Sequence, residues 1–147
     1  MDQAHPLSSP MVVRSVDLEK HPFGPKKPDK ETLGPEVPYL SAIGALMYLA
    51  SHTRLDISFA VSLLSRFSSC PALRHWNGIK HLFRYLQGTK DLGLFYTGRP
   101  GESLAGYADA GYLSDPHHAR SQTGYVFIHN GAAVCWRSKT DISGHIF

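Results

Sequence analysis

Residues 72–86, ALRHWNGIKHLFRYL, carry the clearest helical pattern in the chain. At 100° per residue, one arc of this helix is apolar and the opposite arc is polar. The apolar arc, which we expect to face the core, consists of Trp76, Ile79, Leu82, Phe83 and Leu86. The polar arc consists of Arg74, Asn77, Lys80, His81, Arg84 and Gln87. Pro71 precedes this helix, and Gly88 is expected to end it.

Two further helices are expected upstream of this one. Residues 39–51 (YLSAIGALMYLAS) have apolar side chains at helical spacing, and Pro38 fits the first turn. Residues 57–67 (ISFAVSLLSRF) are apolar on most sides, which predicts a buried helix. We expect Asp56 to cap that helix and Arg54 to be a surface charge. Residues 39–90 are therefore predicted to form one helical segment.

The first 38 residues hold seven of the ten prolines. Proline forbids helix interiors and removes backbone donors, so this stretch is predicted to be an extended and mostly unpacked arm. Short packed pieces are expected around residues 12–16 and Phe23.

The pattern changes to strands after Gly88. Apolar or alternating runs predict strands at 92–96, 104–109, 123–129 and 132–139. Asn130 and Gly131 separate the last two and suit a type I′ hairpin turn, because both residues tolerate positive φ. Residues 91–147 are thus predicted to form a small antiparallel sheet, and the fold class is α+β.

Bulk properties limit the class of protein. The chain has 147 residues, 42% of them hydrophobic, and a net charge of +3, which suits one domain or slightly more. No run is long enough to span a membrane, and residues 1–10 lack the pattern of a secretory signal, so an intracellular location is expected. Cys70 and Cys135 form no disulfide or metal-ligand pattern and are expected to be inert thiols.

The basic residues are concentrated in one part of the chain. Residues 39–100 hold seven Lys and Arg against two Asp and Glu. Such an excess is the footprint of a phosphate-binding surface, although a solvated helical face gives the same count. The candidate nucleic-acid contacts are Arg74, Lys80, His81 and Arg84.

No pattern in the sequence predicts a cofactor or a metal ion. His117 and His118 lack a third ligand at useful spacing, and His75 and His81 are six residues apart, so they do not stack as a ligand pair on a helix. Asp115 and Asp141 are expected to be surface residues.

Eight strings of the sequence, in order along residues 10–139, resemble the copia-type retrotransposon polyprotein where reverse transcriptase joins RNase H. They are 38–48 (PYLSAIGALMY), 53–61 (TRLDISFAV), 64–67 (LSRF), 75–89 (HWNGIKHLFRYLQGT), 93–96 (GLFY), 106–110 (GYADA), 120–127 (RSQTGYVF) and 133–139 (AVCWRSK). The resemblance implies that residues 39–90 form the thumb or connection region, which cradles template–primer duplex. It also implies that residues 104–139 form the first three strands of an RNase H half-fold.

RNase H chemistry uses two metal ions held by clustered carboxylates. The resemblance places Asp109 at the first of these acids. The family pattern ends near Thr140, before the helix that carries the next glutamate, and the polymerase aspartates belong upstream of Met1. Asp109 is therefore expected to be a vestigial ligand or a strand-end aspartate that bonds backbone amides. We expect a non-catalytic, incomplete fragment that acts by binding only.

The string Arg84, Tyr85, Leu86 and Gln87 resembles the RxLR signal of oomycete effectors, and the chain as a whole resembles secreted RxLR effector proteins of a downy mildew. This resemblance implies an alternative. The chain would be secreted, enter the host cytoplasm or nucleus, bind a host protein and suppress host cell death. The string lies in the helix at 72–86 with Leu86 in the apolar arc, which counts against its use as an exposed signal.

Overall fold

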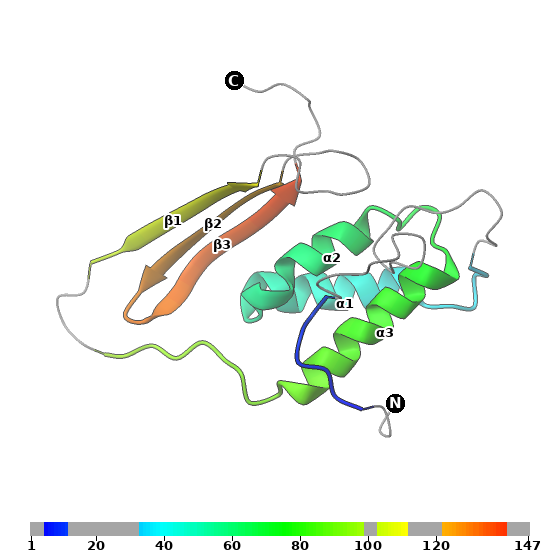
Figure 1. The fold of residues 1–147 in the computed structure, drawn as a ribbon, viewed down its shortest axis with the longest axis horizontal. Helices are drawn as coiled ribbons and strands as arrows, with labels where there is room; N and C mark the ends of the chain where they lie inside the picture. The colour runs from blue at the N-terminus through cyan, green and yellow to red at the C-terminus, as the bar shows by residue number, and fades with distance from the viewer. Residues whose placement is uncertain (1–4, 12–32, 99–102, 112–121, 141–147) are drawn as a thin grey trace.

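A computed structural model describes residues 5–11, 33–98, 103–111 and 122–140 (Figure 1). Within these ranges the chain forms helices followed by an antiparallel sheet, which confirms the α+β class. No helix of the described part is long and apolar enough to cross a membrane.

All three expected helices are present. Helix α1 spans Tyr39–His52 and helix α3 spans Leu73–Gly88. Between them lie the short 3₁₀ helix η1, Leu55–Ile57, and helix α2, Ser58–Ser65. The middle helix was expected at 57–67. In the structure a 3₁₀ turn precedes it, and α2 ends two residues before the expected end.

The helices pack around one apolar core. Its most deeply buried members are Tyr39, Ile43, Leu46, Ile57, Leu64, Ile79 and Leu82. The Tyr39 hydroxyl donates a hydrogen bond to the Leu64 carbonyl at 2.8 Å, which satisfies the one polar atom of that side chain inside the core. Burial raises the pKa of the Tyr39 hydroxyl, so the donor keeps its proton.

The buried face of α3 includes two side chains outside the predicted apolar arc. His75 is fully buried, and its ring stacks on Phe67 with centroids 3.8 Å apart. The Ala72 N–H donates to His75 Nδ1 at 3.0 Å and so closes the start of the helix. Tyr85 is also buried. Ile79 and Leu82 are buried as predicted, whereas the remaining members of the arc are half-buried against the core: Trp76, Phe83 and Leu86.

The expected roles of Arg54 and Asp56 are wrong. Arg54 is only 8% exposed, and its guanidinium binds both carboxylate oxygens of Asp56, at 3.0 and 2.7 Å. The same guanidinium donates to Thr89 at the end of α3, and the Tyr85 hydroxyl donates to Asp56 at 2.7 Å. Asp56 makes no cap bond to α2. The carboxylate is instead held by a guanidinium and a phenol, which together tie η1 to α3.

The first described residues, 5–11, lie extended along α3 (Figure 1). Leu7 and Met11 pack against the helical core, and the Leu7 N–H donates to the Arg84 carbonyl at 3.4 Å. A side chain at Gly88 would lie 2.8 Å from Pro6, so this glycine lets the arm approach the helix end. This part of the arm is extended as expected but is packed. Residues 12–16 and Phe23 lie outside the described residues.

Three strands form the sheet in the order β1-β2-β3, each antiparallel to its neighbour. They span Ala105–Gly111, Gln122–His129 and Ala132–Thr140. The expected hairpin between β2 and β3 is confirmed, because Asn130 has φ 50° and Gly131 has φ 82°.

The expected strand at 92–96 is wrong. These residues form no strand, and Phe95 is 81% exposed. The segment runs beside the hairpin turn, where the Thr97 N–H donates to the Asn130 carbonyl at 2.8 Å and the Tyr96 hydroxyl donates to the Ala133 carbonyl at 2.7 Å. Strand pairing ends at that turn. Residues 92–96 are therefore held there by these two hydrogen bonds and do not pair with a strand.

The two faces of the sheet have different surroundings. Alternation along β2 and β3 directs Val126, Ile128 and Trp136 to an inner face, and β3 is the strand that contacts α2 (Figure 1). The Trp136 Nε1–H donates to the Ala50 carbonyl of α1 at 2.6 Å. The opposite, outer face carries Tyr125, Phe127 and Arg137, all of them exposed.

Candidate functional site

The four predicted nucleic-acid contacts lie on α3 and are half-buried. We call Arg74, Lys80, His81 and Arg84 the α3 cationic face. Helix α3 contains no aspartate or glutamate, so its three full positive charges are not neutralised within the helix. The structure therefore places the predicted residues on one element, as the sequence indicates.

The arm covers part of the α3 cationic face. His81 Nε2 donates to the Ser9 carbonyl at 2.9 Å, and Arg84 Nε donates to the His5 carbonyl at 2.8 Å. Both acceptors are neutral, so the positive charge of Arg84 remains uncompensated by this contact. A guanidinium has five N–H donors, and one bond to the arm leaves the group able to contact a phosphate. Residues 5–11 of the arm thus contact this side of α3 through neutral backbone carbonyls.

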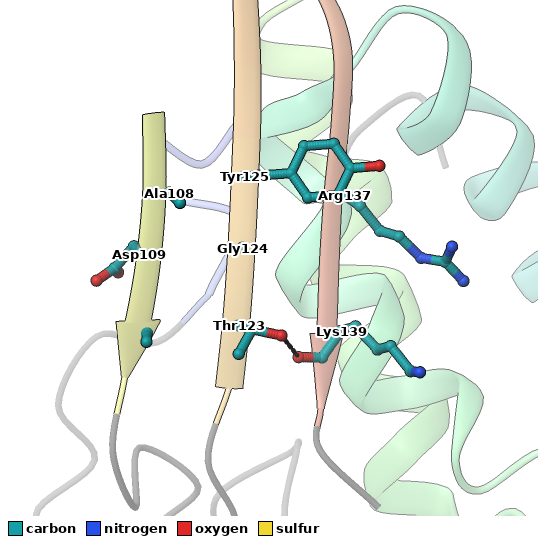
Figure 2. A pocket seen from close by; sticks show the side chains of 8 residues that line it. Ala108, Asp109, Thr123, Gly124, Tyr125, Arg137 and Lys139 are labelled. Atoms are coloured by element: carbon teal, nitrogen blue, oxygen red, sulfur yellow. Dashed lines mark hydrogen bonds between the residues drawn. The ribbon is translucent and has the colours of Figure 1, made fainter. Parts of the chain in front are cut away.

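Asp109, the predicted vestigial ligand, lies on β1, where it pairs with Gly124. Its side chain is exposed and points away from Tyr125, Arg137 and Lys139 (Figure 2). Within the described ranges, no group of three or more His, Cys, Asp and Glu side chains could hold a metal ion. Among the described residues, Asp109 is thus not part of a ligand cluster of the kind that a two-metal centre, with several oxygen ligands per ion, requires.

The outer face of the sheet has a polar and aromatic surface that sequence reasoning missed. An open pocket of about 400 Å³ lies over it, lined by Ala108, Thr123, Tyr125, Arg137, Lys139 and their neighbours. Figure 2 shows Arg137 and Lys139 extending from β3 on the same side as the Tyr125 ring. The alternation of Tyr125 with Phe127 and of Arg137 with Lys139 is the signal that could have found this surface from sequence.

The RxLR-like string forms part of the packed helix. Arg84 binds the arm, Tyr85 is 5% exposed with its hydroxyl on Asp56, and Leu86 packs against the core. Gln87 is half-buried. The string is therefore folded into α3, as its place in the sequence predicts.

The remaining candidates show no catalytic arrangement within the described ranges. Cys70 and Cys135 are both exposed and form no disulfide, and Cys135 Sγ lies 4.0 Å from the Tyr125 hydroxyl. The predictions for Asp115 and Asp141, and for the histidine pair that follows Asp115, fall outside the described residues.

The sequence is similar to several known proteins, although no family model and no solved structure matches it. It is 48% identical over 103 residues to "Secreted RxLR effector protein 161" of Plasmopara viticola. This match covers 70% of this chain and 72% of that protein. It is 38% identical over 139 residues to "Retrovirus-related Pol polyprotein from transposon TNT 1-94" of Nicotiana tabacum. It is 35% identical over 136 residues to a putative transposon Ty5-1 protein of Saccharomyces cerevisiae.

The extent of these matches differs. The tobacco polyprotein match covers 95% of this chain but 10% of the polyprotein, and the yeast match covers 90% of this chain and 44% of that protein. Nearly the whole chain therefore corresponds to a small part of a much longer transposon protein.

Proposed function

Because the chain belongs to the family of copia-type retrotransposon polyproteins, we propose that it acts by binding nucleic acid and not by cutting it. The observation that carries this proposal is the charge of α3. Three full cations and a histidine lie on one helix without a single carboxylate. Lys and Arg side chains that neutralise phosphates release counterions, which is the main source of sequence-independent affinity for nucleic acid.

The surroundings of Asp109 support binding in place of cleavage. A two-metal nuclease centre must concentrate negative charge, so that two cations sit between the carboxylates. Asp109 is the one carboxylate of the three described strands, and its side chain lies on the opposite side of the sheet from Arg137 and Lys139. These strands therefore supply fewer oxygen ligands than such a centre needs.

Binding to duplex nucleic acid tests the proposal. The double variant with Lys80→Gln and Arg74→Gln should weaken binding to a 20-base-pair duplex, and the slope of log K against log salt should fall by about 1.8, roughly 0.9 for each phosphate that is no longer neutralised. Lys90→Gln is the matched control, because Lys90 is an exposed cation beyond the end of α3. Binding that ignores salt, or equal weakening in variant and control, would contradict the proposal.

The non-catalytic part has its own test. An RNA–DNA hybrid incubated with the protein and Mg²⁺ or Mn²⁺ should remain intact, and Asp109→Ala should change nothing. Cleavage that Asp109→Ala abolishes would show that the aspartate belongs to a working centre.

A second candidate function is that of an effector, which the 48% identity to the Plasmopara protein favours. In this case the chain would be secreted, enter a plant cell and suppress cell death through a host protein. The folded state of the Arg84–Gln87 string means that this role would use another part of the surface. Expression of the chain in leaves should then reduce induced cell death, and an unaltered response would remove this candidate.

A further inference from the structure

The outer face of the sheet combines aromatic rings with cations through strand register alone. Ala108, Tyr125 and Arg137 are cross-strand partners, so their side chains lie on the same face. Thr123 and Lys139 form the next pair on this face, two residues along each strand. Tyr125 on β2 therefore lies beside Arg137 on β3, and Phe127, whose partner is Cys135, lies two residues farther along the same face.

The two rings are held in place and remain accessible. Tyr125 and Phe127 are each 39% exposed, and their ring centroids are 5.8 Å apart with planes at 63°. A Cβ at Gly106 would lie 2.7 Å from the Phe127 ring, so this ring lies directly over the β1 backbone. One side of Phe127 thus rests on the sheet, and exposed ring area remains for a ligand.

The charge of this surface selects the ligand. Arg137 and Lys139 are exposed, whereas Asp109, the one acid of the three described strands, points to the opposite side (Figure 2). The open pocket of about 400 Å³ at these residues lies in the size range of small-molecule sites, which is about 300–1,000 Å³. Aromatic rings next to cations are suited to a ligand that has flat faces and phosphates together.

We propose that the outer face of the sheet binds single-stranded nucleic acid, with bases stacked on Tyr125 and Phe127 and phosphates on Arg137 and Lys139. A duplex hides its base faces within the stack, whereas unpaired bases can lie on an aromatic ring of an open sheet. The inference rests on the proposed function, and it adds a second surface with a different preference from the α3 cationic face.

Anisotropy of a labelled 12-nucleotide single strand and of a matched duplex tests this inference with the full chain. Tyr125→Ala and Phe127→Ala should each weaken single-strand binding by about 5- to 150-fold, the usual loss for one stacked base, and leave duplex binding unchanged. Tyr125→Phe should keep most of the affinity, because it retains the ring. Phe95→Ala is the matched control, since Phe95 is an 81% exposed aromatic outside the sheet.

A second variant tests the cations without removing either ring. The double change Arg137→Gln and Lys139→Gln should lower the salt slope of single-strand binding by about 1.4, near 0.7 for each phosphate that is no longer neutralised. Unchanged single-strand binding in the ring variants, or an equal loss with Phe95→Ala, would overturn the inference. Duplex binding that persists in that case leaves the proposed function intact, whereas loss of all nucleic-acid binding in the unmodified chain refutes both.

Discussion

The helical part of the molecule is closed and the sheet is open. Helices α1, α2 and α3 bury their apolar faces against one another, and even the Arg54 guanidinium is enclosed by partners. The sheet packs against α2 through β3 on its inner face, while Tyr125 and Phe127 remain exposed on the outer one. The difference indicates that stability comes mainly from the helices, and that the sheet is free to present side chains to a ligand.

The strongest test of this comparison is a pair of truncations to alanine. Leu82→Ala should destabilise the fold by about 2–5 kcal/mol, because Leu82 is fully buried and its removal leaves a cavity. Phe127→Ala should cost about 1–2 kcal/mol, since the residue is 39% exposed and its burial is only partial. Urea denaturation of both variants measures the difference, and similar destabilisation would mean that the sheet carries as much of the core as the helices.

Removal of Arg54 examines the polar part of the closed region. Arg54→Met should lower the free energy of unfolding by about 2–3 kcal/mol. This is less than the roughly 3–5 kcal/mol for breaking a fully buried ion pair, because Asp56 is partly exposed. Thermal unfolding at pH 7 measures this destabilisation. Lys90→Met provides the exposed control and should be close to neutral.

The same network gives the stability of the fold a pH dependence. Burial raises the pKa of the Asp56 carboxyl, but hydrogen bonds from Arg54 and Tyr85 and the charge of Arg54 outweigh this and hold the pKa below its ordinary value of 3.8. Stability from this group is therefore complete above pH 3.8 and is lost as pH falls through the lower pKa of the folded state. Asp56→Asn should reduce this loss of stability at acid pH, measured by urea denaturation at a series of pH values. An unchanged loss would show that Asp56 is not the group responsible.

Substitutions in the turn between β2 and β3 should change the stability of the fold by a smaller amount. Gly131→Ala should cost about 1–2 kcal/mol, because Gly131 has φ 82°, where a Cβ is disfavoured. Asn130→Gly, at φ 50°, should be nearly neutral. Chemical denaturation that finds equal effects at the two positions would show that the turn is not the strained conformation described.

The junction between the two regions gives the smallest effect. Trp136→Phe removes the 2.6 Å hydrogen bond to the Ala50 carbonyl and should cost about 1 kcal/mol. Hydrogen exchange should then show faster opening of β3, with α3 unchanged. Faster exchange throughout the molecule would mean that the helices and the sheet unfold as one unit.

Local patterns in the sequence predicted most of the elements. The helices, the hairpin turn and the α3 cationic face follow from periodicity, from Asn130 and Gly131, and from the spacing of the cations. The segment at 92–96 misled, because its apolar residues have strand character but lie beside a turn with no strand to pair with. The aromatic and cationic surface on the outer face was missed because its rings and cations come from different strands.

The sequence by itself determined the three helices and the three strands of the sheet, since periodicity and turn residues act over a few neighbours along the chain. Only the tertiary structure decided that Arg54 is enclosed by Asp56 and Thr89, that the arm lies on α3, and that Tyr125 faces the same side as Arg137. These contacts join residues from separate elements, and the free energy that fixes them comes from packing that no single segment contains.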